Sequence, residues 1–407
     1  MNSFSRRSVL AAAAAGSLAA AAEAAGAQTA ENMLQPARPG RGGTDHGPRN
    51  VMRDQENPDL LVPPSTDSGT LPNLRFSFSD AHMRLETGGW TRQVTTRELG
   101  IAKEMAGVNM RLNAGGVREL HWHKASEWAY LLYGTARITA MDYDGNYFVD
   151  DIGVGDIWYF PSGVPHSIQG LGPDGCEFLL VFDDGDFDED NTFMIADWFK
   201  HVPTEVIGKN FGVPASLFEN TPEESKRYIF PAPLPGPLSA DKISGAKPAP
   251  QTFSARLMAQ EPIRTAGGTV RINDSRNFPV NTTTAAAIVE VNPGGLRELH
   301  WHPNDEWLYV IEGQARMGVF AGHGQARTFD LKAGDVGYVP MAMGHYLENT
   351  GTTQFRFLET FKSPYFIDLS LDTWMALTPP TLLQAHLNLD RRVMDALRKT
   401  KAPVVPA

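Results

Sequence analysis

The chain has 407 residues, which is enough for two domains of ordinary size, each with its own core. Its 42% hydrophobic and 20% charged residues are typical of a soluble globular protein. The formal net charge of −11 argues against nucleic acid or an anionic membrane surface as the main partner. This net charge does not exclude a small anionic substrate, because a few arginines or a metal ion can dominate the charge of a small site.

The N-terminus has the features of an export signal. It reads "MNSFSRRSVLAAAAAGSLAAAAEAAGAQ", with a basic start, an Ala-rich run and a small-residue ending. Its "SRRSVL" resembles a twin-arginine signal, so we expect residues 1–27 to direct the protein to the periplasm or out of the cell. A membrane anchor or an Ala-rich tail is the alternative, although the run is short for a membrane span. The single cysteine, Cys176, allows no intramolecular disulfide and is expected to be a small buried apolar residue.

The rest of the chain predicts an all-β protein with two tandem domains. Residues 28–70 are polar and rich in Gly and Pro, and we expect an extended arm that could wrap a neighbouring chain. Apolar runs broken by Gly, Asp-Gly and Pro fill residues 71–230, followed by a Pro-rich linker at 231–250 and a second β-rich domain at 251–407. "DWFKHVPTEVIGKNFG" and "TPPTLLQAHLNLDRRVMDALRK" predict short helices at the end of each domain.

The two halves are a repeat. The strand-like "RELHWHKASEWAYLLYGTAR" at 118–137 returns as "RELHWHPNDEWLYVIEGQAR" at 297–316, an offset of 297 − 118 = 179. Further along, Trp198 matches Trp374 at 374 − 198 = 176, so the first half holds three extra residues. They fall in the acidic loop "DDGDFDEDNTF" at 183–193, which has no counterpart in the second half.

The repeated strand carries metal-ligand chemistry. His121 and His123 lie two residues apart, so both point to one face of a strand, and Glu127 and His166 complete a set of three imidazoles and one carboxylate. The same set returns in the second half as His300, His302, Glu306 and His345. Absence of thiolate argues against structural zinc, and the open coordination positions suit Mn²⁺ or Fe²⁺.

These residues fit the two motifs of the cupin family. Gly115-x5-His121-x-His123-x3-Glu127-x6-Gly134 resembles the first motif, and "GDIWYFPSGVPH" resembles the second, although Gly170 stands where an Asn is usual. The second half repeats both motifs, with "PMAMG" in place of Pro-x-Gly. The chain therefore resembles a bicupin, two double-stranded β-helix barrels in tandem. With "EFLLVFDDG" and "GDVGYVPMAMGHYLEN", the resemblance over residues 50–400 extends to the bacterial oxalate decarboxylases.

This resemblance implies an activity and a set of site residues. It implies two Mn²⁺ per chain, with Fe²⁺ as the less favoured metal, and dioxygen as co-catalyst for converting oxalate to formate and carbon dioxide. Arg118 and Arg297 match the arginine that holds the oxalate carboxylate. Strict strand alternation places Arg118 on the face opposite His121, so this role requires a local bend; the alternative is an outward arginine paired with Glu119.

Two glutamates are candidates for proton transfer. Glu189 matches the proton donor of the family's mobile lid, although Asp188, Asp190 and Asn191 replace the usual Ser, Asn and Ser. The alternative for this loop is a solvated acidic turn. Glu359 takes the place of Leu180 on an otherwise aromatic strand face, so its pKa should be raised. It serves either proton transfer or as a structural partner of Arg297.

Other functions stay open on the same scaffold. Oxalate oxidase, giving carbon dioxide and hydrogen peroxide, is the nearest, followed by a bicupin oxygenase for a bulkier substrate and a non-enzymatic metal-binding storage bicupin. The resemblance also implies a homo-oligomer, a trimer or a hexamer, with oxalate as the small-molecule partner.

Overall fold

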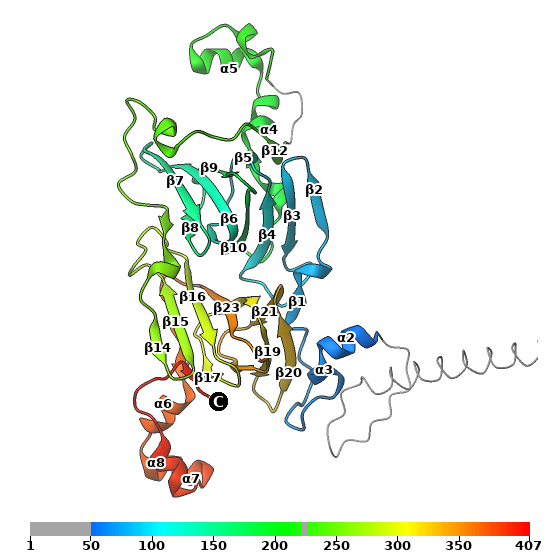
Figure 1. The fold of residues 1–407 in the computed structure, drawn as a ribbon, viewed down its shortest axis with the longest axis vertical. Helices are drawn as coiled ribbons and strands as arrows, with labels where there is room; N and C mark the ends of the chain where they lie inside the picture. Colours follow the sequence, from blue (N-terminus) through cyan, green and yellow to red (C-terminus); the bar gives the residue numbers. More distant parts are fainter. Residues whose placement is uncertain (1–49, 222–226) are drawn as a thin grey trace, which may run out of the picture.

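The computed structural model of the chain describes residues 50–221 and 227–407. It shows two stacked β-barrels with short helices at opposite ends (Figure 1), which confirms the predicted fold class. The export signal expected at residues 1–27 lies outside the described residues. Within them, no helix is long and apolar enough to cross a bilayer.

The first barrel is built from one 12-stranded sheet. Its longest strand, β6 (Glu127–Met141), pairs with β10 and β8 at one end and with β7 and β9 at the other, so it links the two walls. Gly145, at φ 79°, lies in the predicted Asp-Gly turn between β6 and β7. Cys176 is buried and free, as expected. The other strands are β2 (Met83–Glu86), β3 (Gly89–Val94), β4 (Ala106–Leu112), β5 (Gly116–Trp122), β7 (Tyr147–Gly153), β8 (Ile157–Phe160), β9 (His166–Gly170), β10 (Cys176–Phe182), β11 (Phe193–Met194), β12 (Ile229–Pro231) and β13 (Ser254–Ala255).

The second barrel repeats this design in two sheets. Its 7-stranded sheet has the order β1-β21-β18-β23-β16-β15-β14, and its 6-stranded sheet contains β20-β19-β22-β17-β24 with β25 beside β17. Apolar side chains that alternate along the strands fill each barrel interior. The strands are β1 (Arg75–Ser77), β14 (Ile263–Thr265), β15 (Gly268–Asn273), β16 (Thr284–Val291), β17 (Leu296–Trp301), β18 (Glu306–Glu312), β19 (Gln314–Phe320), β20 (Ala326–Lys332), β21 (Asp335–Val339), β22 (Gly344–Asn349), β23 (Phe355–Lys362), β24 (Leu369–Ser370) and β25 (Val404–Val405).

A third apolar cluster fills the space between the barrels. Trp128 and Trp307, equivalent in the repeat, are both fully buried in it. Two short strands also cross between the barrels: β1 pairs with β21 of the second barrel, and β13 pairs with β8 of the first. The domain boundaries expected at residues 71 and 251 therefore do not separate two self-contained units.

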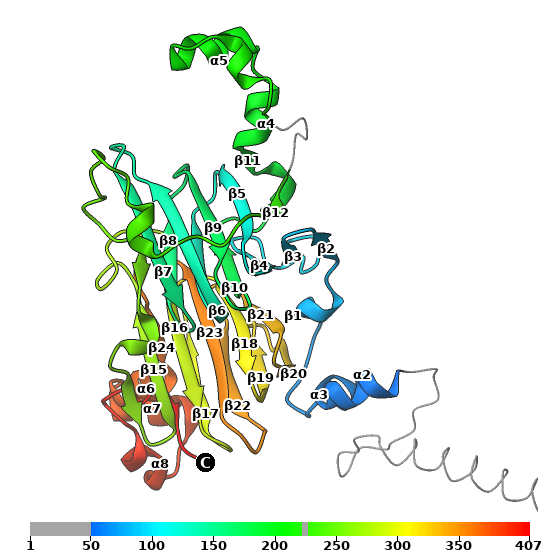
Figure 2. The same ribbon diagram turned by 45° about the horizontal axis from the view of Figure 1, so that its top comes forward.

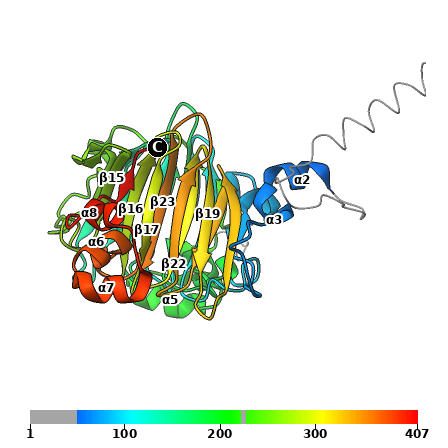
Figure 3. The same ribbon diagram turned by 90° about the horizontal axis from the view of Figure 1, so that it is seen from below.

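The described part of the N-terminal arm is not extended over its whole length. Residues 50–70 contain α2 (Val51–Glu56) and α3 (Pro58–Leu61), because Asn50 caps the first helix and Pro58 begins the second. Buried Asp59 accepts a hydrogen bond from Arg316 at 2.6 Å. The arm thus packs on the second barrel of its own chain (Figure 3).

Short helices extend both ends of the molecule (Figures 1 and 2). Beyond the first barrel lie α4 (Ile195–Lys200) and α5 (Thr204–Phe211). Beyond the second lie α6 (Leu371–Ala376), α7 (Pro380–Leu387) and α8 (Arg391–Ala396). Single 3-10 turns are η1 (Phe78–Asp80), η2 (Glu189–Asn191), η3 (Ala215–Phe218), η4 (Leu238–Asp241) and η5 (Leu257–Ala259).

Candidate metal centres

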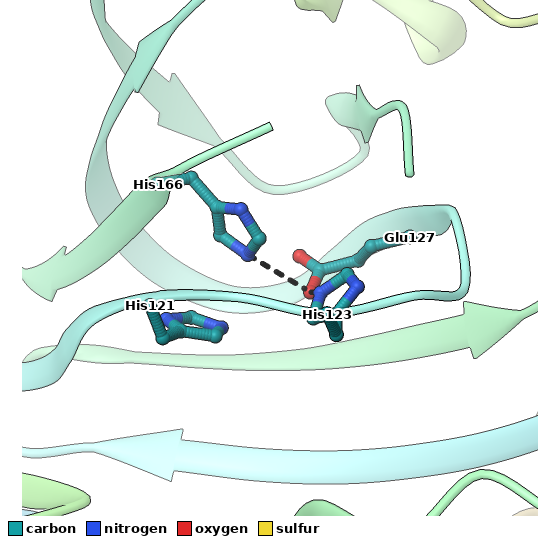
Figure 4. A group of neighbouring side chains, drawn as sticks. All are labelled: His121, His123, Glu127 and His166. Atoms are coloured by element: carbon teal, nitrogen blue, oxygen red, sulfur yellow. Dashed lines mark hydrogen bonds and ion pairs between the residues drawn. The ribbon is translucent and has the colours of Figure 1, made fainter. Parts of the chain in front are cut away.

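Four side chains converge inside the first barrel (Figure 4). His121 lies on β5 and His123 directly after it, while Glu127 begins β6 and His166 begins β9. One ligand atom of each lies within 4.8 Å of the others, and all four residues are buried. Nε2 of His123 is 3.3 Å and Nε2 of His166 is 3.5 Å from Oε2 of Glu127. The spacing in the sequence thus becomes a single cluster of three nitrogens and a carboxylate.

Hydrogen bonds orient each imidazole toward the centre. The Nδ1–H groups of His121, His123 and His166 donate to main-chain carbonyls at 2.6, 2.6 and 2.8 Å, which leaves each Nε2 free as a ligand. Burial and then the guanidinium of Arg118 lower the pKa of His121 well below its usual value, so this ring is neutral. Burial raises the pKa of Glu127, but His166 and His123 outweigh it and hold that pKa well below the usual range. Neutral imidazoles with an ionised carboxylate are the state a divalent cation binds.

The second barrel repeats the cluster. His300, His302, Glu306 and His345 are buried with ligand atoms within 4.8 Å of one another. Nε2 of His302 and of His345 lie 3.1 and 3.0 Å from Oε2 of Glu306. One outer contact differs: Trp158 Nε1 donates to Glu127 Oε1 at 2.8 Å in the first centre, whereas Oε1 of Glu306 has no hydrogen-bond partner in the described part of the chain.

Arg118 reaches the first centre through a bend in β5. The register of β5 against β9 shifts between Arg118 and His121, so both side chains face the same cavity. Its guanidinium is buried, and its Nη1 atom has no hydrogen-bond partner. Among the residues that the structure describes, no carboxylate pairs with Arg118, the outward partner Glu119 included. A buried cation without a counter-ion is a strong site for an anion.

Arg297, at the equivalent position, is already neutralised. Its Nη2 lies 2.7 Å from Oδ2 of Asp368 and 3.4 Å from Oε1 of Glu359, and both Arg297 and Glu359 are fully buried. Asp368 also pairs with Lys401. Burial raises the pKa of Glu359 to about 7, as its apolar surroundings predicted, although Arg297 opposes this shift. The second centre therefore carries its own carboxylates where the first has an unpaired arginine.

Glu189 is turned into the first cavity. It is buried in η2, and its Oε1 accepts a hydrogen bond from Thr91 Oγ1 at 2.6 Å. Burial raises its pKa, and Thr91 and Arg118 oppose that shift. The remaining cavity is only about 10 Å³, which leaves no room for a small-molecule ligand while the loop is in this position. The residues lining it are Met110, Arg118, His121, His123, Glu127, Ile168, Leu180, Phe182, Phe187, Glu189 and Tyr228.

Sequence reasoning missed three residues of this site. Thr91, on β3, hydrogen-bonds Glu189. Tyr228 lies under the guanidinium of Arg118, with 3.9 Å between the guanidinium carbon and the ring centre. Trp158 hydrogen-bonds Glu127 and orients its carboxylate. For Trp158 a signal exists in the repeat, because the equivalent position holds Gly337. Nothing in the sequence indicates that Tyr228, more than a hundred residues from Arg118, belongs to the site.

Comparisons with known proteins agree with this geometry. The Cupin family profile matches residues 78–216 and 256–395. Oxalate decarboxylase OxdC of Bacillus subtilis is 56% identical over 376 residues, covering 92% of this chain and 97% of that protein. A probable oxalate decarboxylase of Arthroderma benhamiae is 42% identical, covering 90% and 91%.

Solved structures extend the likeness to three dimensions. Oxalate decarboxylase from Bacillus subtilis at pH 4.6 superposes with a TM-score of 0.88 at 55% identity, covering 91% of this chain and 97% of that one. A second structure of the B. subtilis enzyme, described for its Mn(II) centres, gives a TM-score of 0.89 and covers 92% and 99%. With both cupin motifs, both ligand clusters and this coverage, the chain belongs to the oxalate decarboxylase family of bicupins.

Proposed function

We propose that this protein decarboxylates oxalate to formate and carbon dioxide, with a manganese ion in each barrel and dioxygen as co-catalyst. The observation that carries the proposal is Arg118, a buried guanidinium that pairs with no carboxylate of the described residues and lies beside a His₃Glu cluster. A small dianion supplies the missing counter-charge. The relatives named oxalate decarboxylase support the choice of oxalate.

The donor sets fit manganese. Three imidazoles and one carboxylate leave coordination positions open, and the Nε2 atoms converge with the carboxylate. When bound, the metal with dioxygen supplies the one-electron oxidation that oxalate needs, because oxalate has no electron sink of its own. Iron(II) suits the same donors and is the less favoured metal.

The chain's own residues bind the substrate, exclude water and deliver the proton. Arg118 pairs with one oxalate carboxylate and fixes its orientation. Phe182 and Phe187, stacked at 3.6 Å between ring centres, form an apolar wall against water. Glu189, whose raised pKa favours the protonated form, donates the hydrogen that becomes the C–H of formate once the C–C bond has broken.

We assign turnover to the first centre. Only there is the arginine free to receive a substrate carboxylate, and Glu189 stands beside it. In the second centre Glu359 and Asp368 occupy the guanidinium of Arg297, so oxalate would have to displace the buried Glu359 and the half-buried Asp368. On this reasoning Glu359 and Arg297 serve the structure of the second barrel.

We also propose that the chain forms a trimer or hexamer. Its projecting helices expose Trp198, Phe211, Leu217, Trp374 and Leu377. Apolar cavities of about 490 and 620 Å³ lie beside them, on the outer sheet faces of the first and second barrels. Helices of one copy that fill these cavities on another would cover both apolar surfaces. Light scattering of the purified protein should give a multiple of the chain mass.

Export by the twin-arginine route is likewise a proposal. It rests on "SRRSVL" and the Ala-rich run that follows. This route carries folded proteins, so the metal could be loaded before export. Replacing both arginines of the pair, Arg6 and Arg7, with lysine should leave the protein in the cytoplasm in a fractionation experiment.

One experiment tests the activity directly. Manganese-loaded protein is incubated with oxalate in air at mildly acidic pH, with formate followed by NMR and hydrogen peroxide by a coupled dye. Formate in large excess, suppressed in Glu189→Ala, supports decarboxylation with Glu189 as the proton donor. Peroxide without formate would instead assign oxalate oxidase, and neither product would end the oxalate assignment.

A further inference from the structure

The acidic loop 183–193 is here called the lid, and its acidic tip, residues 186–190, is fastened to one strip of the chain. That strip, residues 84–97, comprises most of the β2–β3 hairpin and the turn after it, and we call it the lid dock. The contacts are the Asp186–Thr96 hydrogen bond, the Asp188–Arg97 ion pair at 3.7 Å, the Glu189–Thr91 hydrogen bond at 2.6 Å and the Asp190–Arg84 ion pair at 3.2 Å. Each acidic residue from Asp186 to Asp190 therefore has a partner in the dock.

Thr91 and Arg84 are the central pair of the dock. They are directly opposite each other in the β2–β3 ladder. Thr91 is fully buried and donates to the Glu189 carboxyl, while Arg84 reaches Asp190 at the lid surface. The guanidinium of Arg84 also lies 4.0 Å from the ring centre of Tyr228, the same ring that Arg118 covers. Arg84 thus joins the lid to the wall of the substrate cavity.

The second barrel provides an internal comparison. Its residues at the same offset of 179 are Ile263 for Arg84 and Val270 for Thr91, and these two also pair across a ladder. In that barrel a shorter loop, residues 363–368, joins the equivalent strands β23 and β24. The guanidinium and the hydroxyl therefore occur in the barrel with the longer, acidic loop, and aliphatic side chains replace both in the other barrel.

The geometry points to Arg84 and Thr91 as positioning residues for the proton donor: Thr91 holds the Glu189 carboxyl over the cavity, and Arg84 fastens the closed lid through Asp190. The inference rests on the proposed decarboxylase function for its chemical consequence. A closed lid keeps water out while Glu189 delivers its proton. A loosened lid diverts oxalate to the oxidase reaction, in which two electrons and two protons pass to dioxygen and give two carbon dioxide and one hydrogen peroxide.

The fastening is also reversible. Since the closed cavity holds only about 10 Å³, the lid must open in every turnover. The Arg84–Asp190 pair suits this need, because the Asp190 side chain is 69% exposed and exposed ion pairs are weak and screened by salt. The buried Thr91–Glu189 bond then decides where the carboxyl lies once the lid has closed.

The test compares matched variants of the manganese-loaded protein. Thr91→Val introduces the residue of the second barrel, and Thr91→Ser restores the hydroxyl. Arg84→Gln removes the charge, and Thr269→Val makes the same hydroxyl deletion on β15, away from the lid. Two readouts are taken, hydrogen–deuterium exchange of the 183–193 peptide and the ratio of formate to peroxide, with manganese content and circular dichroism as checks of folding.

We expect lid exchange about tenfold faster in Thr91→Val, near native in Thr91→Ser and unchanged in Thr269→Val. Arg84→Gln should speed it about two- to fivefold. It should also reduce the acceleration that about 0.5 M salt produces in the native protein, while the Asp188–Arg97 pair keeps the rest. Both dock variants should shift products toward peroxide. If native protein makes formate but neither readout changes in folded, metal-replete variants, the inference is wrong. If lid exchange responds while native protein makes no formate, the dock stands and the decarboxylase assignment fails.

Discussion

The two equivalent arginines should respond in opposite ways to the same substitution. Arg297 is fully buried between Asp368 at 2.7 Å and Glu359 at 3.4 Å. Arg297→Met leaves the buried Glu359 without its cation and the half-buried Asp368 with Lys401 alone, and breaking a buried pair in this way costs about 3–5 kcal/mol. For a domain of this size that corresponds to a fall of roughly 6–20 °C in the melting temperature. Oxalate turnover at 25 °C should survive, because the first centre is untouched.

Arg118→Met should have the opposite effect, with nearly native stability and loss of oxalate turnover. No carboxylate of the described residues forms an ion pair with Arg118, so its removal breaks no buried pair, and the loss is limited to its contact with Tyr228, about 0.5–2 kcal/mol. Formate production should be lost. Calorimetry and formate NMR on both variants, each with its manganese content measured, check the pair. Equal destabilisation, or loss of turnover in folded, two-manganese Arg297→Met, would refute the distinction between the centres.

Three further results are expected. Because burial raises the pKa of Glu189 and the donor must be protonated, formate production should be greatest at acidic pH and fall as the pH rises through that raised pKa, measured as initial rates across pH 4–8 with metal occupancy held constant. The pKa of Glu359 in the folded state is about 7, above its usual value of 4.5. Its contribution to the free energy of unfolding is therefore present below pH 4.5 and is lost as the pH rises through about 7. Urea titrations over this pH range should show a smaller loss of stability in Glu359→Gln than in the native protein. A Cβ at Gly107 would clash with the ring of Trp307, so Gly107→Ala should destabilise the protein by about 1–3 kcal/mol at the barrel interface. The control Gly100→Ala, whose Cβ would have its nearest contact at 3.8 Å, should leave the stability unchanged. Similar unfolding curves for the two variants would contradict this packing.

The sequence was most informative where chemistry follows a short, repeated spacing. His121 and His123 lie two residues apart, so strand alternation alone predicts that they share one face. The constant offset of 179 residues between the repeats, 300 − 121, predicts the same for His300 and His302. Strand parity misplaced Arg118, because a register shift cannot be seen in a regular-looking strand. The crossing strands β1 and β13 are only three and two residues long, too short for any periodic pattern.

Contacts between distant segments were also beyond sequence reasoning. Thr91 and Glu189 are separated by 98 positions, and Arg297 and Asp368 by 71. Each pair depends on which strands become neighbours in the barrel. The replacement of Leu180 by Glu359 was visible in the repeat and its raised pKa was predicted, but the choice between proton transfer and pairing with Arg297 needed the distances.

The crossing strands bear on how this chain can be divided. Each barrel takes an edge strand from the other half, β1 at β21 and β13 at β8. A cut in the linker just before β13 would leave each half without a strand that its sheet needs, with unpaired main-chain groups exposed for self-association. The repeat therefore forms one structural unit, and we expect its two halves to fold and unfold together.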